Sequence, residues 1–136
     1  ILSLLTEAEA VEEAEFVLSL LGDTELELPI VFDEERVLND TARTDGITGE
    51  QMSANARAFC ERVRAAGYES MIYANMYSEI FLYDMEALSD ISFWYADYEA
   101  QPQTPYAFTY WQFAESGKMN GVNGNVDLNL RFRREE

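Results

Sequence analysis

Two acidic side chains, Asp33 and Glu35, stand two residues apart directly after the continuous apolar segment Leu28–Phe32. If extended backbone persists beyond that segment, the two-residue period of a strand places both carboxyl groups on one face and Glu34 on the other. Two carboxyl groups that share a site perturb each other, so one is ionised while the other keeps its proton to higher pH. This arrangement suits protonation of a leaving oxygen. The alternative is a solvated acidic loop, because Asp-x-Glu is a short and common pattern.

A third carboxylate and a group of aromatic side chains fall near the ends of other expected strands. Asp127 stands in an Asn- and Gly-rich stretch, where it is either a third carboxylate of the same site or part of an ordinary Asx turn. Aromatic faces suit the apolar C–H faces of sugar rings, and neighbouring amides suit their hydroxyl groups, although roughly half of the aromatics are expected to be core residues. The candidate substrate-binding residues are Tyr73, Asn75, Trp94, Tyr98, Trp111 and Gln112.

The composition excludes several other kinds of chemistry. The 136 residues contain 9 Lys and Arg against 26 Asp and Glu, which gives a formal net charge of −17, and they contain no His. The acidic balance argues against a nucleic-acid partner, because phosphate contacts need clustered basic side chains. Without His, catalytic triads that use it and nearly all ordinary zinc sites are excluded. Cys60 is the single cysteine, so no disulfide forms within the chain, and we predict neither a cofactor nor a bound metal.

Local signals predict the elements that must position these residues. Capping boxes and apolar residues at helical spacing predict helices over Thr6–Leu21 and Thr48–Gly67. The continuous apolarity of Leu28–Phe32 predicts a strand buried on both faces, as in a parallel sheet. A further strand over Ser70–Ala74 completes a strand–helix–strand unit, and such units are parallel in nearly all proteins.

Beyond residue 75 the expected helices become short. Met76–Leu88 holds at most one or two short turns, and three strands are predicted over Ile91–Ala96, Ala107–Phe113 and Asn125–Asn129. The prediction is one α/β domain over residues 1–136, in which a full helix joins the first two of five strands and loops join the last three. No apolar run approaches the roughly 18 residues of a membrane span, and no signal-peptide pattern is visible in the sequence.

Six groups of residues follow one another with plausible gaps: Leu28–Glu35, Ala58–Tyr68, Ile72–Asn75, Phe93–Tyr98, Tyr110–Phe113 and Gly121–Asn129. Each group alone is a weak signal, whereas six in order are specific. Together they resemble glycoside hydrolase family 25, the Chalaropsis-type lysozymes or N-acetylmuramidases. The resemblance covers nearly the whole chain.

The resemblance implies a fold, an activity and residue roles. The family fold is an irregular TIM-like barrel, in which α/β units are followed by helix-poor strands. The implied activity is hydrolysis of the β-1,4 bonds between N-acetylmuramic acid and N-acetylglucosamine in peptidoglycan, at the cell wall or outside the cell. Glu35 would be the general acid and base, and Asp33 would orient the N-acetyl group or stabilise developing positive charge. Asp127 would be the late active-site carboxylate.

The sequence also departs from the family pattern. Glu34 stands where the family commonly has an apolar residue, which adds negative charge beside the site, and Asp97 has no clear family counterpart and is left out of the catalytic set. The family's opening strands, with another active-site aspartate, have no counterpart here, and a complete barrel needs roughly 200 residues or more. We therefore expect the later two-thirds of a barrel in a processed or truncated chain. A missing N-terminal segment or a second chain would complete it.

Two other functions remain open at this stage. A chitinase-like barrel also places Asp-x-Glu at a strand end, and activity on chitin oligomers but not on peptidoglycan would identify it. An incomplete barrel could instead be a non-catalytic glycan-binding or structural remnant. Glycan binding without bond cleavage would identify that third function.

Overall fold

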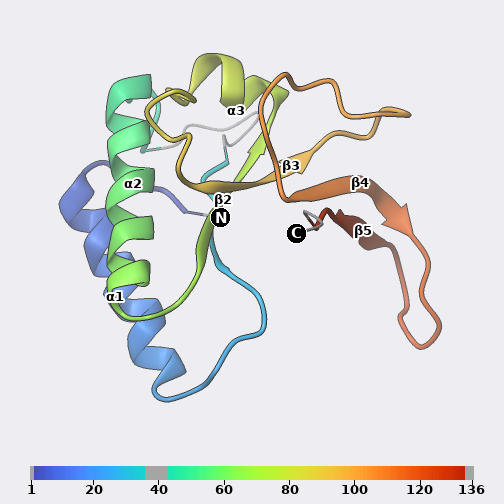
Figure 1. Cartoon of the computed structure of the whole chain (residues 1–136), viewed down its shortest axis with the longest axis horizontal. Helices are drawn as coiled ribbons and strands as arrows, with labels where there is room; N and C mark the ends of the chain where they lie inside the picture. Colours follow the sequence, from blue (N-terminus) through green and yellow to red (C-terminus); the bar gives the residue numbers. More distant parts are fainter. Residues whose placement is uncertain (1, 36–42, 134–136) are drawn as a thin grey trace.

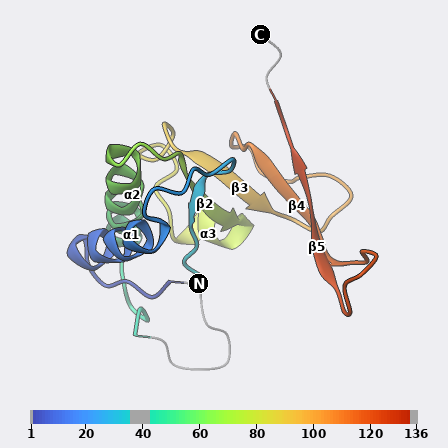
Figure 2. The same cartoon turned by 90° about the horizontal axis from the view of Figure 1, so that it is seen from below.

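The computed structural model describes residues 2–35 and 43–133, which form a mixed α/β fold around one curled five-stranded sheet. Helix α1 lies against α2, and α2 covers β1 and β2, whereas β4 and β5 extend beyond the helices (Figures 1 and 2). The elements in chain order are α1 (Glu7–Leu21), β1 (Ile30–Phe32), α2 (Gly49–Ala65), β2 (Ser70–Asn75), α3 (Met76–Phe81), β3 (Ser92–Ala96), β4 (Tyr110–Gly117) and β5 (Val126–Arg131).

Both long helices begin where their caps predict. The side-chain oxygen of Thr6 accepts a hydrogen bond from the Glu9 amide at 3.2 Å, and that of Thr48 accepts one from the Gln51 amide at 3.1 Å. Each cap satisfies an amide that the first helical turn leaves without a partner. In the part of the chain that the structure describes, no helix is long and apolar enough to cross a membrane.

The hydrophobic core lies between the helices and one face of the sheet. Phe32 on β1 meets Phe59 on α2 edge-to-face, with ring centroids 5.4 Å apart, and Ile72 on β2 is fully buried beside them. Helix α1 buries only Ala10 and Ala14 completely, and these small side chains allow it to lie close to α2. Helix α2 therefore lies on the face of Phe32 and Ile72, and the other face carries Val31 and Met71 as well as Tyr73 and Trp94.

The five predicted strands are confirmed, in the order β1-β2-β3-β4-β5, and the first four are parallel. Strand β4 begins at Tyr110, three residues later than predicted, and runs on to Gly117. The sequence signal missed this extension because residues 114–117 are small or polar. Hydrogen bonds from β5 hold them in the sheet instead, so tertiary pairing overrides local preference.

Strand β5 runs antiparallel to β4, a direction that the sequence did not predict. The connection over residues 118–125 is too short for the crossover that a parallel strand needs, so the chain turns back on itself. Gly121 and Gly124 adopt φ values of 89° and 111° in this turn, a backbone region that glycine enters without steric cost. As a result the amino end of β5 lies at the carboxyl end of β4.

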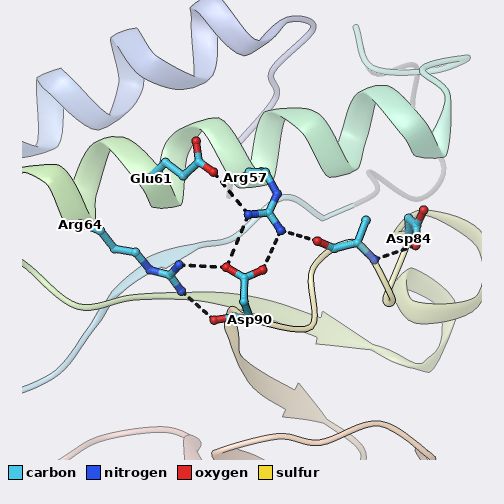
Figure 3. Close-up of polar contacts among 6 residues, drawn as sticks. Arg57, Glu61, Arg64, Asp84 and Asp90 are labelled. Atoms are coloured by element: carbon cyan, nitrogen blue, oxygen red, sulfur yellow. Dashed lines mark hydrogen bonds and ion pairs between the residues drawn. The ribbon is translucent and has the colours of Figure 1, made fainter.

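An ion-pair cluster ties α2 to the turn that precedes β3 (Figure 3). Arg57 contacts Asp90 at 2.7 Å and Glu61 at 3.3 Å, and it also donates to the carbonyl oxygen of Ala87. Arg64 contacts the other carboxylate oxygen of Asp90 at 3.3 Å. The hydrogen bond from Arg57 is the main cause that lowers the pKa of Asp90 to about 2.

We expect Asp90→Asn to lower the free energy of unfolding at neutral pH by about 1 kcal/mol, because the cluster is exposed and screened by solvent. Since the pKa of Asp90 is lower in the folded chain, its contribution is present above the unfolded pKa of about 4. The contribution is lost as the pH falls from there towards about 2. Urea unfolding of both proteins should therefore show a difference that shrinks in acid. The matched variant Glu12→Gln, at an exposed position on α1, should show no such difference.

Candidate active site

The carboxyl groups of Asp33 and Glu35 meet just beyond the carboxyl end of β1, where a hydrogen bond joins them. Glu34, between them, is 3 % exposed and accepts a hydrogen bond from the Leu4 amide at 3.3 Å. The two-residue alternation predicted this arrangement. Burial is the main cause that raises the pKa of Glu35, and the negative charge of Asp33 and the hydrogen bond to it raise the pKa further.

Two tyrosines and a glutamine form a hydrogen-bonded group on the same side of the sheet. The hydroxyl groups of Tyr73 and Tyr98 each donate to Oε1 of Gln112, both at 2.8 Å, and Gln112 is only 4 % exposed. Burial is the main cause that raises the pKa of Tyr73, and the charges of Glu35 and Asp33 add to it. The group therefore lies close to the carboxyl pair, and both phenols stay neutral hydrogen-bond donors.

Trp94 and Asn129 continue this polar face toward β5. The Trp94 ring packs edge-to-face on Tyr73 with centroids 5.0 Å apart, and its indole N–H donates to Oδ1 of Asn129 at 2.8 Å. Asn129 is paired in register with Gln112. The sequence reasoning missed Asn129 as a site residue, although its position two residues after Asp127 on one strand was the available signal.

Asp127 lies within β5 rather than in a turn. Its charge is one of the influences that raise the pKa of Tyr98, for which burial is the main cause. The antiparallel direction of β5 thus brings Asp127 to the carboxyl end of β4, near Tyr98, which follows β3. Asp127 is not among the groups that shift the pKa of Glu35.

Two predicted substrate-binding residues have other partners in the structure. The side-chain oxygen of Asn75 accepts hydrogen bonds from the amide and the hydroxyl of Ser78, both at 3.0 Å, in the capping box that begins α3. The indole N–H of Trp111 donates to the carbonyl oxygen of Asp97 at 2.7 Å. The structure therefore brings together Tyr73, Trp94, Tyr98 and Gln112. Asn75 caps α3, and Trp111 is hydrogen-bonded to the main chain of Asp97.

A cavity of about 470 Å³ opens beside Glu35 and is also lined by Tyr77 on α3 and Met52 on α2. A larger cavity of about 710 Å³ lies at the amino ends of β3 and β4, near Ser92 and Thr109, away from the carboxyl pair. Both Glu34 and Glu35 line the smaller cavity, whereas Tyr73, Trp94, Tyr98 and Gln112 lie outside its lining. Within residues 2–35 and 43–133, no group of three or more acidic or cysteine side chains is arranged to hold a metal ion.

Comparison with known proteins gives a family match. The model of the family described as "Glycosyl hydrolases family 25" matches residues 2–122. The autolytic lysozyme of Clostridium acetobutylicum is 24 % identical over 118 residues, which are 85 % of this chain and 34 % of that protein. Asp127 and Asn129 lie beyond the matched range, so their place in the site rests on the pairing of β5 with β4.

Solved structures share the fold. The spore cortex lytic enzyme SleM of Clostridium perfringens superposes with a TM-score of 0.72 at 24 % identity, over 94 % of this chain and 46 % of that one. A family 25 glycosyl hydrolase of Bacillus anthracis gives a TM-score of 0.71 at 23 % identity, over 93 % and 59 %. The chain thus spans about a third of the curated relative and about half of these solved structures.

We expect Asp33→Asn to lower the pKa of Glu35 toward its ordinary value, because the substitution removes the neighbouring charge. Burial would keep the pKa partly raised. A titration of the Glu35 side-chain carboxyl signal by NMR measures the change. The matched variant Asp127→Asn should leave the Glu35 pKa unchanged, since Asp127 is not among the charges that act on it. An unchanged pKa in Asp33→Asn would contradict the coupling of the pair.

Proposed function

Because this chain belongs to family 25 of the glycosyl hydrolases, we propose that it supplies the carboxyl pair and part of the glycan site of a peptidoglycan hydrolase. The bond cleaved would be the β-1,4 bond between N-acetylmuramic acid and N-acetylglucosamine. The observation that carries this proposal is the contact between Asp33 and Glu35, in which Glu35 has the raised pKa. A carboxyl group that stays protonated beside an ionised one is what glycosidic cleavage requires.

In the first step, Glu35 donates its proton to the glycosidic oxygen while the bond from that oxygen to C1 of the sugar breaks. Positive charge develops on the sugar ring as the bond lengthens. We propose that the carbonyl oxygen of the substrate's own N-acetyl group then bonds to C1. Asp33 would orient that N-acetyl group and stabilise the positive charge on it.

In the second step, water attacks C1 and displaces the N-acetyl oxygen. Glu35, now a carboxylate, takes a proton from this water and returns to its starting state. The same side chain therefore acts first as acid and then as base. Its burial favours the protonated form that the first step needs, and transfer of the proton to the leaving group produces the carboxylate that the second step needs.

The polar face beside the pair would hold the glycan. The hydroxyl protons of Tyr73 and Tyr98 go to Gln112, so their oxygens would accept hydrogen bonds from sugar hydroxyls. The flat ring of Trp94 suits the apolar face of a sugar. Asp127 would complete the site from β5 as a third carboxylate. We assign no nucleic-acid or cofactor role to this face.

We further propose that the five strands are the later part of an irregular TIM-like barrel, and that residues 1–136 form about two-thirds of one catalytic domain. Strands β1 and β5 are the two edges of the sheet. Closure of a barrel requires further strands to pair between these edges, whether from the same polypeptide or from a second chain. The complete domain would act at the cell wall or outside the cell.

We expect Glu35→Gln to reduce release of reducing ends from purified peptidoglycan by roughly a hundredfold or more, because general acid catalysis is lost. The assay should use the complete natural protein, and circular dichroism should show that the variant is folded. The matched control is Glu34→Gln, one residue away, which keeps an oxygen for the Leu4 amide and should retain most activity. Undiminished hydrolysis by Glu35→Gln would overturn the assignment. Cleavage of chitin oligomers but not of peptidoglycan would identify a chitinase-like enzyme instead.

The rate of hydrolysis should fall as the pH rises through the raised pKa of Glu35, because only the protonated acid can act in the first step. The alkaline limb of the profile of kcat/KM against pH reports this pKa in the free enzyme. An alkaline limb at the ordinary pKa of an exposed glutamate would contradict the role of burial. The limb should agree with the NMR titration of the same carboxyl group.

A further inference from the structure

Asp97, which follows the last residue of β3, uses both carboxylate oxygens to organise the loop between β3 and β4. Its Oδ1 accepts the amide of Glu99 at 3.0 Å, and its Oδ2 accepts the amide of Gln103 at 2.9 Å. Oδ2 also accepts the hydroxyl of the buried Tyr95 at 3.1 Å. The side chain therefore fixes the first turn of the loop to the end of its own strand.

The main chain of Asp97 is also held, in this case by β4. Its amide donates to the carbonyl oxygen of Gln112 at 3.1 Å, and its carbonyl oxygen accepts the indole N–H of Trp111 at 2.7 Å. These contacts fix the backbone at the point where the chain leaves β3. Trp111 thus holds the main chain of Asp97 through a hydrogen bond from the neighbouring strand.

Tyr98 is the next residue along the chain. Its side chain is 50 % exposed, so packing alone does not determine where its ring lies. Its hydroxyl nevertheless reaches Oε1 of Gln112 at 2.8 Å, beside Tyr73. The backbone next to Tyr98 is held by the contacts of Asp97 described above.

A second anchor holds the same loop further along. The hydroxyl of Thr104 donates to Oε2 of Glu79 on α3 at 2.6 Å, and its oxygen accepts the amide of Tyr106 at 3.0 Å. Glu79 is only 4 % exposed. The loop between β3 and β4 is therefore tied at its start to β3 and β4 and at its middle to α3.

We propose that Asp97 is a positioning residue for glycan binding, which acts through Tyr98 by holding the start of the β3–β4 loop against Trp111 and β4. This inference rests on the proposed function of the same face. Asp97 does not touch the substrate in this proposal. Loss of its carboxylate releases two loop amides and the Tyr95 hydroxyl, so the Tyr98 ring loses its fixed direction before any glycan arrives.

A double-mutant cycle tests this proposal, because two residues that act through one contact give non-additive effects. The probe is a soluble oligosaccharide of alternating N-acetylglucosamine and N-acetylmuramic acid, and calorimetry measures its dissociation constant. The complete protein carries Glu35→Gln throughout, so that the probe is not cleaved. Asp97→Ala and Tyr98→Ala should each weaken binding by about tenfold, and the double variant should be no weaker than the weaker single variant.

The matched control is Asp84→Ala, because Asp84 also caps a loop, accepting the Ala87 amide at 3.0 Å, on the turn before β3. It should lower the melting temperature as Asp97→Ala does and leave glycan binding unchanged. If Asp97→Ala does not fold, Asp97→Asn replaces it in the cycle. The asparagine keeps one acceptor oxygen, so its loss of affinity should be smaller and should again vanish in the Tyr98→Ala background.

Three results would overturn the proposal while leaving the proposed function intact. They are unchanged binding in both Asp97 variants, fully additive losses in the double variant, and an equal loss of binding in Asp84→Ala. Failure of the Glu35→Gln protein to bind the oligosaccharide at all would overturn the proposed glycan site, and the role of Asp97 with it. The two failures are therefore distinguishable in one set of measurements.

Discussion

The register between neighbouring strands is the constraint on which the candidate site depends. Tyr73 pairs with Trp94 across β2 and β3, and Gln112 pairs with Asn129 across β4 and β5. Because successive side chains of a strand point to opposite faces, a slip of one residue would turn Tyr73 into the core and bring Ile72 out of it. The apolar core on the helix side opposes such a slip. The packing that stabilises one face of the sheet thus fixes the chemistry of the other.

The carboxyl groups of this acidic chain differ through their surroundings rather than through their number. Asp90 lies between two arginines at the surface, and its pKa is lowered. Glu34, Glu35 and Glu79 are partly or wholly buried, and burial is the main cause that raises the pKa of each. Of these three, Glu35 alone has a neighbouring carboxyl group in direct contact. Burial and a charged neighbour acting on one group are typical of a catalytic acid.

The family match and the pairing of β5 concern different parts of the chain. The match ends at residue 122, whereas Asp127 and Asn129 reach the site through the turn that reverses β5. The carboxyl pair on β1 lies at one edge of the sheet, and β5 is the other edge.

The sequence by itself determined the features that neighbouring residues decide. Caps predicted where α1 and α2 begin, apolar runs predicted five strands, and the alternation along one strand placed Asp33 and Glu35 together. Each of these depends on residues within a few positions of one another, so local patterns are sufficient. The resemblance of short ordered segments then indicated the family, which the match over residues 2–122 confirmed.

Only the tertiary structure decided which polar groups meet. The sequence left Asp97 without a role and predicted Trp111 as a substrate-binding residue. The fold adds a hydrogen bond between the two, across β3 and β4. It likewise assigned Asn75 to the cap of α3 and brought Asn129 to Trp94, 35 positions away in the chain. Hydrogen-bond partners at such separations are set by strand pairing and direction. No local pattern in the sequence records that pairing, because it exists only once the sheet has formed.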